Sequence, residues 1–228
     1  MQLDQPLPRR SAPPQLRSEA DPPLVIIVDD HAPVREALSE LIRSAGFRPV
    51  CFASTHELLD ADVIDSPGCL ILDVRLPGAS GLDLQHHLAR TGNPKPIIFL
   101  TGHGDIPMTV QAMKAGAVDF LTKPVRDQTL LDAVAVGIER DAAQRARTRV
   151  VRLHADRYRT LTRRERQVMC AVALGQVNKQ IAHHLGISEV TVKLHRSNVM
   201  HKMQLASVGE LVRAWEALPA GLREAAED

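Results

Sequence analysis

The sequence predicts an α/β fold, a doubly wound five-stranded parallel sheet, followed by a separate all-α unit. Short apolar runs alternate with amphipathic helical patterns over residues 24–121, and this alternation is typical of a parallel sheet with helices on both faces. A long, increasingly charged helical pattern without proline comes next. Short helical patterns with capping residues then fill the chain from residue 158, which indicates a second, helical unit.

Charged side chains are distributed unevenly between the two units. Residues 24–125 carry eight Lys and Arg against twelve Asp and Glu, a net charge of −4. Residues 159–203 carry eight against two, a net charge of +6. An acidic first unit and a basic second unit indicate two tasks, and the basic unit favours a polyanionic partner.

Strands and helices alternate along the first unit. After the first strand, an apolar helical pattern that includes Leu38 and Ile42 runs until Gly46. Further helices are expected near residues 55–61, 81–90 and 106–115. The expected strands are Leu24–Val28, Val50–Phe52, Cys69–Leu72, Pro96–Leu100 and Val118–Leu121.

A long helix is expected from Asp127 to about Tyr158, because Gly137 is the only glycine and there is no proline between them. We interpret its charged second half as a solvated linker, and pairing of this helix in a dimer stays open. Beyond it, two helices joined by a tight turn at Gly186 make a helix-turn-helix candidate. The expected caps of the helices in this unit are Thr162 with Glu165, Asn178, Ser188, and Ser207 with Glu210.

These patterns divide the chain into a disordered arm (residues 1–23), a first domain (24–140), a helical linker (141–157) and a second domain (158–228). The arm is rich in Pro and charge and lacks an apolar core, so we do not expect a signal peptide. No apolar run approaches the ~20 residues of a membrane span, and a cytoplasmic protein is expected. Cys51, Cys69 and Cys170 lack C-x-x-C spacing and are expected to be reduced core thiols.

Polar residues of three kinds lie where the expected strands end. Asp29 and Asp30 follow the first strand, Asp73 the third, Thr101 the fourth and Lys123 the fifth. The carboxyl ends of parallel strands meet at one edge of the sheet, so these side chains are expected to converge. Each alone has an ordinary explanation, such as a helix cap or a solvated lysine. Together, carboxylates that suit Mg²⁺, a lysine and a hydroxyl are what phosphoryl transfer to a carboxylate requires.

The motifs around these residues resemble the receiver domain of two-component response regulators. They are Val28-Asp-Asp30, Leu70-Ile-Leu-Asp73 with Pro77-Gly78, and Phe120-Leu-Thr-Lys-Pro124. The stretch from Thr101 to Val110, continuing to Lys114-Ala-Gly-Ala117, resembles the FixJ-like branch. The resemblance covers about residues 24–140.

The resemblance implies that Asp73 accepts a phosphoryl group from a sensor histidine kinase. Asp30 would ligate Mg²⁺ directly, Asp29 through water, and Arg75 through its backbone carbonyl. Thr101 and Lys123 would contact the phosphoryl oxygens. The Lys123–Pro124 bond is expected to be cis, as in this family.

Phe120 holds the position of the family's switch aromatic, and an ordinary core role is compatible with it. On phosphorylation, Thr101 would move toward the phosphate and the ring would turn inward. The face made by the fourth helix, the fifth strand and the fifth helix would then be remodelled, and it dimerises in many relatives. His31 departs from the family, because many relatives carry an acidic residue there.

Residues 190–203 form a helix with two different faces. Val192, Val199 and Met203 are spaced to face a core, whereas Lys193 and Ser197 lie on another stripe. A solvated amphipathic helix would show the same pattern. The surrounding charge of +6 favours a helix that enters the major groove of DNA.

Residues 158–220 resemble the LuxR-type helix-turn-helix. The resemblance rests on Leu161-Thr-Arg-Arg-Glu165, Asn178-Lys-Gln-Ile-Ala182, Leu185-Gly-Ile-Ser188 and Thr191-Val-Lys-Leu-His195. By position, the expected contacts to base edges are Lys193, Leu194 and Ser197, and those to phosphates are Lys179, Thr191, Arg196 and Lys202. The last helix, around Leu211–Trp215, resembles the dimerisation helix of this domain type.

The sequence therefore favours a phosphorylation-controlled transcription factor that binds promoter DNA as a homodimer. The resemblance alone makes activation the better expectation, with RNA polymerase as a further partner. Neither a membrane nor catalysis is expected. A haloacid-dehalogenase-like phosphatase would need a second Asp two residues after the nucleophile, where this chain has Arg75. A LuxR-type regulator gated by a ligand would not need the acidic pocket or Lys123.

Overall fold

The computed structural model describes residues 22–102 and 104–224. They divide into two compact units, one ending at Asp141 and the next beginning at Ala142. The expected disordered arm lies almost wholly outside the described residues. Among the helices of the described ranges, none has the length and apolar character that crossing a membrane requires.

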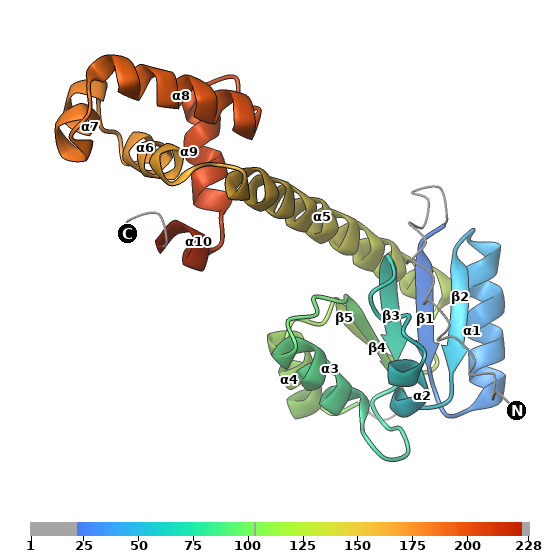
Figure 1. The fold of residues 1–228 in the computed structure, drawn as a ribbon. Coiled ribbons are helices and arrows are strands. Elements are labelled where there is room, and N and C mark those ends of the chain that lie inside the picture. Colours follow the sequence, from blue (N-terminus) through green and yellow to red (C-terminus); the bar gives the residue numbers. More distant parts are fainter. Residues whose placement is uncertain (1–21, 103, 225–228) are drawn as a thin grey trace, which may run out of the picture. The chain divides into compact units, whose positions relative to one another are not determined.

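The first unit is a parallel sheet with helices on both faces, as predicted (Figure 1). Its strands are β1 (Leu24–Val28), β2 (Arg48–Phe52), β3 (Gly68–Leu72), β4 (Ile97–Thr101) and β5 (Asp119–Thr122). Its first four helices are α1 (Ala32–Ser44), α2 (Thr55–Asp60), α3 (Gly81–Arg90) and α4 (Ile106–Lys114). The strand order β2-β1-β3-β4-β5 reverses direction between β1 and β3, where doubly wound sheets place their sites.

Two apolar cores flank this sheet, because successive strand side chains point to opposite faces. Ile26 and Phe99 pack on the side that α2, α3 and α4 cover. Ile27 and Ile98 pack on the other side, against α1 and the long helix α5 (Asp127–Arg159). Burial on both faces explains why β1, β3 and β4 read as continuous apolar runs.

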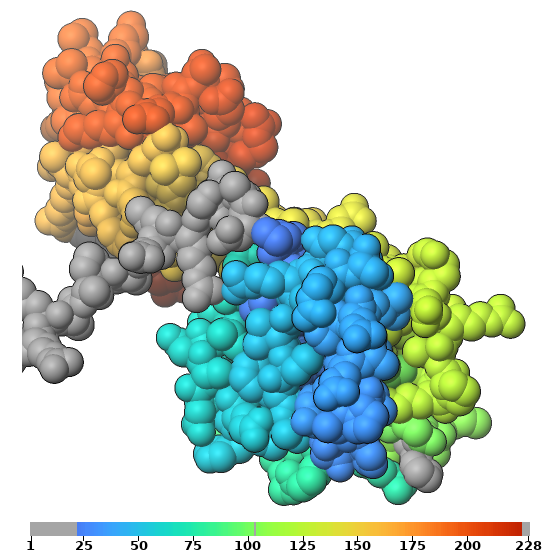
Figure 2. Space-filling model, turned by 90° about the vertical axis from the view of Figure 1, so that its right-hand side faces the viewer, coloured from blue at the N-terminus to red at the C-terminus, as the bar shows by residue number. Residues whose placement is uncertain are grey.

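The edge strand β2 is less buried than the central strands. Figure 2 views the first unit from the side that α1 and β2 form, shown in blue. Cys51 on this strand is exposed, so the expectation of a core thiol is wrong there, because an edge position leaves part of the strand open to solvent. Cys69 and Cys170 are buried thiols, as predicted.

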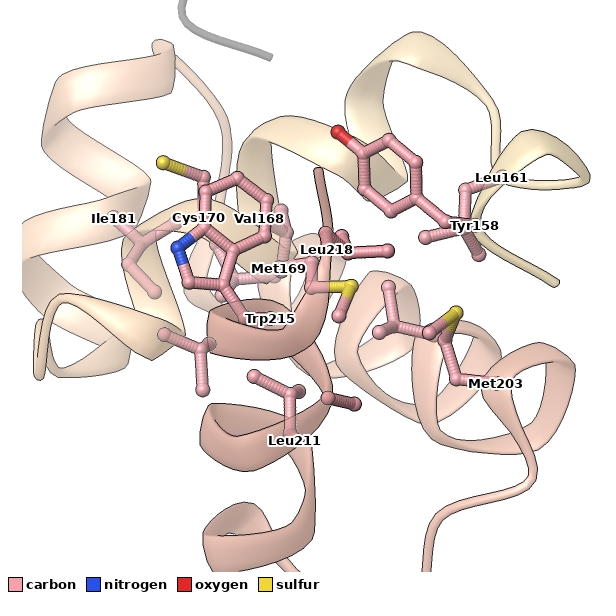
Figure 3. Close-up of a cluster of buried hydrophobic side chains, with 14 of the residues drawn as sticks. Tyr158, Leu161, Val168, Met169, Cys170, Ile181, Met203, Leu211, Trp215 and Leu218 are labelled. Carbon is pink, nitrogen blue, oxygen red and sulfur yellow. The ribbon is translucent and has the colours of Figure 1, made fainter. Parts of the chain in front are cut away.

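The second unit is built from the end of α5 and five further helices. These are α6 (Arg163–Ala173), α7 (Asn178–Leu185), α8 (Glu189–Met203), α9 (Val208–Ala217) and a short α10 (Ala220–Glu224), which the sequence pattern did not predict. Their core contains Tyr158 and Trp215, whose ring centroids lie 6.1 Å apart in an edge-on arrangement (Figure 3). Tyr158 belongs to α5, so the long helix contributes to this core.

Most of the predicted caps are present in the second unit. Thr162 and Glu165 form a reciprocal capping box, and Ser188 accepts a hydrogen bond from the backbone N–H of Thr191. The prediction for Asn178 is wrong, because Val177 occupies the N-cap and its backbone N–H donates to Gln180. Asn178 instead lies in the first turn of α7.

Candidate functional site

The candidate site of the first unit lies at the carboxyl ends of the strands, beside the switch point. Asp29 follows β1 and Asp73 follows β3, and Leu72 pairs with Val28 in the register of these two strands. Thr101 is the last residue of β4 and Lys123 directly follows β5. The backbone N–H of Lys123 donates to the carbonyl of Thr101 at 2.8 Å, which ties the two strand ends together. The Lys123–Pro124 peptide bond is cis, as expected.

Lys123 joins the two buried carboxylates. Its Nζ donates to Asp29 Oδ2 and, at 2.7 Å, to Asp73 Oδ2. The side chains of Asp29 and Asp73 are 3% and 8% exposed, so neither carboxylate is well solvated. Two buried carboxylates this close repel each other, and the ammonium group offsets that repulsion.

The pKa of Lys123 lies above its ordinary value. Burial by itself lowers the pKa, but the hydrogen bonds to Asp29 and Asp73 and the attraction of both carboxylates outweigh it. Lys123 is therefore a fixed positive charge at neutral pH. Such a charge beside Asp73 is suited to binding an anionic group there.

Asp30 and His31 extend the acidic pocket toward solvent. His31 Nδ1 lies 2.9 Å from Asp30 Oδ1 and 3.9 Å from Asp29 Oδ1. One ligand atom from each of the three residues lies within 4.8 Å of the others, which is a spacing that a metal ion could bridge. Buried carboxylate oxygens beside partly exposed ones fit a hard cation that retains water, such as Mg²⁺.

Asp73 is further held by its own loop. The backbone N–H of Arg75 donates to Asp73 Oδ1 at 3.0 Å, and the backbone N–H of Asp73 donates to the carbonyl of Val28 at 2.9 Å. These bonds fix the carboxylate relative to both β1 and β3. The Arg75 carbonyl, expected as a metal ligand, stays a prediction.

Phe120 lies on β5 and is half-buried, with its ring centroid 5.8 Å from that of Phe99. A Cβ added to Gly104 would lie 2.8 Å from Phe120 Cε1, so a side chain at this position would require the ring to shift. Gly104 was not predictable as a neighbour of Phe120, because local patterns do not show which loop approaches a remote ring.

The second candidate site is the outer face of α8. Val192, Val199 and Met203 are fully buried, as their spacing predicted. Lys193, Leu194 and Ser197 are exposed on the outer face, and Leu194 is 59% exposed although it is apolar. Lys179 is exposed on α7 and Thr191 is half-buried near the start of α8. An exposed apolar side chain among polar neighbours is suited to contact with thymine methyl groups.

The side chains of Arg196 and Lys202, both expected at DNA phosphates, form hydrogen bonds within the second unit. Arg196 donates to Asn178 Oδ1 at 2.8 Å and thereby links α8 to α7. Lys202 Nζ donates at 2.7 Å to Oε2 of Glu165, which is 3% exposed. Glu165 thus accepts from both Lys202 and the N–H of Thr162, a role beyond the capping that its spacing predicted.

Comparisons with known proteins match each of the two units to a family. Residues 25–135 match the family described as response regulator receiver domain, and residues 159–215 match bacterial regulatory proteins, luxR family. Nodulation protein W of Bradyrhizobium diazoefficiens is 51% identical over 195 residues, covering 86% of each chain. Response regulator protein TodT of Pseudomonas putida is 48% identical over 199 residues, covering 87% of this chain and 88% of that protein.

Two solved structures of response regulators cover most of this chain. The structure of the response regulator StyR superposes with a TM-score of 0.76 and 46% identity, covering 86% of this chain and 98% of that one. Full-length FixJ from B. japonicum gives a TM-score of 0.53 and 39% identity over 87% of this chain and 98% of that one.

A receiver domain followed by a LuxR-type helix-turn-helix defines the class of response regulator transcription factors. The chain belongs to the FixJ/NarL type of this family. It is a transcription regulator and not an enzyme, so the phosphatase alternative is rejected.

Proposed function

We propose that Asp73 accepts a phosphoryl group from the phosphohistidine of a sensor kinase and that this controls DNA binding. The observation that carries the proposal is the hydrogen bonding of Lys123 to Asp73 beside the acidic pocket. A carboxylate oxygen of Asp73 forms the new P–O bond as the P–N bond to histidine breaks. Lys123 and Thr101 then bind the phosphoryl oxygens, which carry the dispersed negative charge.

Asp29, Asp30, Asp73 and the carbonyl of Arg75 would hold Mg²⁺, which neutralises charge on the transferred group when bound. Asp30 is the more solvent-accessible of the first two, with 32% of its side chain exposed, which suits direct ligation of an incoming ion. Phe120 and Thr101 act as the switch, and the α4–β5–α5 face dimerises on phosphorylation. Ile106 and Val110 on α4 are 81% and 44% exposed, which supports this face as the interface.

In the second domain, α8 enters the major groove of promoter DNA. Lys193, Leu194 and Ser197 contact base edges, and Lys179, Thr191, Arg196 and Lys202 contact phosphates. Because Lys202 is paired with Glu165, its ammonium group would reach only a phosphate that lies close to the Glu165 carboxylate. Dimerisation raises affinity because two half-sites are engaged together.

We further propose that the regulator acts in the cytoplasm, activates transcription and contacts RNA polymerase. Its domains are the receiver (residues 24–140), a helical linker (141–157) and the DNA-binding domain (158–228), after an N-terminal arm (1–23). The two matched families fall within these two domains.

The test is phosphoryl incorporation from acetyl phosphate in Mg²⁺, read by intact mass. We expect a single phosphoryl adduct on the wild type and none on Asp73→Asn. Asp60→Asn is the matched control, since Asp60 is an exposed carboxylate on α2 that pairs with His56. Oligomer size and affinity for a promoter fragment are measured in parallel. An adduct that persists in Asp73→Asn would contradict the assignment.

A further inference from the structure

We propose that His31 supplies a nitrogen ligand to the divalent-cation site, so that this receiver favours a transition-metal ion such as Mn²⁺ more strongly than an all-oxygen site would. The inference rests on the proposed function, because it concerns the ion that would serve Asp73. The residues that carry it are Asp29, Asp30 and His31.

The spacing of the donor atoms fits a six-coordinate ion. In an octahedral site with ligands at 2.0–2.1 Å, neighbouring ligands lie about 3.0 Å apart, and a residue that binds the ion through water, as Asp29 would, lies farther away. His31 Nδ1 is 2.9 Å from Asp30 Oδ1 and 3.9 Å from Asp29 Oδ1. The first pair forms a hydrogen bond here, and its length is also that of two neighbouring ligands.

The backbone holds His31 in place beside the two carboxylates. Its N–H donates to Asp29 Oδ1 at 2.9 Å, and the residue is the N-cap of α1 in extended conformation. The side chain of His31 is 71% exposed and that of Asp29 is 3% exposed. The ring can therefore adjust toward an ion while water completes the coordination on the open side.

A nitrogen donor changes which ions the site prefers. Mg²⁺ takes oxygen ligands and gains little from an imidazole, whereas affinity for nitrogen-containing sites rises from Mn²⁺ through Co²⁺ to Ni²⁺. The Arg35 side chain donates a hydrogen bond to the backbone carbonyl of Asp29 at 2.6 Å, so Arg35 as well as Lys123 places positive charge close to the pocket.

The experiment compares Mn²⁺ and Mg²⁺ binding to the full-length protein by calorimetry. Wild type, His31→Gln and His56→Gln are titrated with each metal alone. His56 is the matched control, because it is an exposed histidine 3.4 Å from the Asp60 carboxylate. We expect His31→Gln to weaken Mn²⁺ binding on the order of tenfold and Mg²⁺ binding by less than about threefold. His56→Gln should change neither.

Electron spin echo spectroscopy of bound Mn²⁺ provides a direct signature. We expect coupling to a ¹⁴N nucleus in the wild type and in His56→Gln, and its loss in His31→Gln. Bound Mn²⁺ without ¹⁴N coupling, or an unchanged ratio of Mn²⁺ to Mg²⁺ affinity in His31→Gln, would overturn the proposal. Phosphorylation of the wild type in Mg²⁺ is measured separately, so that a failure of Asp73 as acceptor is distinguished from a failure of His31 as ligand.

Discussion

Glu165 is an acidic side chain buried within the basic DNA-binding domain. It accepts hydrogen bonds from Lys202 and from the N–H of Thr162, at 2.7 and 2.8 Å. Burial by itself raises the pKa of Glu165, but these hydrogen bonds outweigh it and hold the pKa below its ordinary value. The charged form is therefore the one that stabilises the domain.

We expect Glu165→Gln to lower the free energy of unfolding of the DNA-binding domain by about 1–3 kcal/mol at neutral pH, because Lys202 loses its buried partner. The folded-state pKa is depressed, so the contribution of Glu165 is present above its ordinary value of 4.5 and is lost as pH falls through the folded-state value. The difference from wild type should therefore shrink at acidic pH. Urea unfolding between neutral pH and pH ~3 measures it.

Glu216→Gln is the control for this substitution, since Glu216 is exposed on α9. It should change the free energy of unfolding by less than about 0.5 kcal/mol. A Glu165→Gln protein as stable as this control at neutral pH would show that the ion pair with Lys202 adds nothing to stability.

At the scale of the element, α8 stabilises the domain through its buried face and would contact DNA through its exposed face. Val199 is fully buried in the core, and Lys193 is exposed on the outer face. Burial of apolar side chains on the inner face stabilises the domain, whereas the exposed outer face can contact DNA. Substitutions on the two faces should therefore have different effects.

We expect Val199→Ala to cost about 2 kcal/mol of stability through the cavity that it leaves. Lys193→Ala should leave stability within about 0.5 kcal/mol of wild type but weaken binding to the preferred DNA about tenfold or more. Urea unfolding and fluorescence anisotropy with a DNA fragment selected from a random pool measure the two quantities. Arg90→Ala, an exposed arginine on α3, is the control for charge. Equal DNA affinity of Lys193→Ala and this control would exclude Lys193 from the interface.

At the scale of the whole molecule, the two units have separate apolar cores. Two cores flank the sheet of the receiver, and a third core lies among α5, α6, α7, α8 and α9. A ligand of the receiver pocket should therefore stabilise only one of the two units.

We expect calorimetric unfolding to show two transitions, of which Mg²⁺ raises only that of the receiver. At ten times its dissociation constant, a bound ion adds about 1.4 kcal/mol to the stability of the unit that binds it. Asp30→Asn should reduce or abolish the shift, while the transition of the DNA-binding domain stays unchanged. A shift of the second transition that persists in Asp30→Asn would place the cation elsewhere.

Much of the receiver and of its pocket was predictable, because the determinants are local. Apolar runs mark β1, β3 and β4, and the residue after a parallel strand must lie at the shared edge of the sheet. Asp29, Asp73, Thr101 and Lys123 were found in this way and lie at the strand ends as predicted. The buried face of α8 was equally predictable, since it follows from helical periodicity alone.

The sequence by itself determined the fold class, the two domains and the set of residues at the strand ends, since all follow from local periodicity and strand direction. Only the tertiary structure decided that Glu165 binds Lys202, that Gly104 lies against Phe120, that Val177 and not Asn178 caps α7, and that Cys51 is exposed. Most of these depend on distances between residues remote in sequence or on the position of a strand at the sheet edge. Capping of α7 depends on the backbone angles at one residue. Neither kind of information is contained in a local pattern of apolar and polar residues.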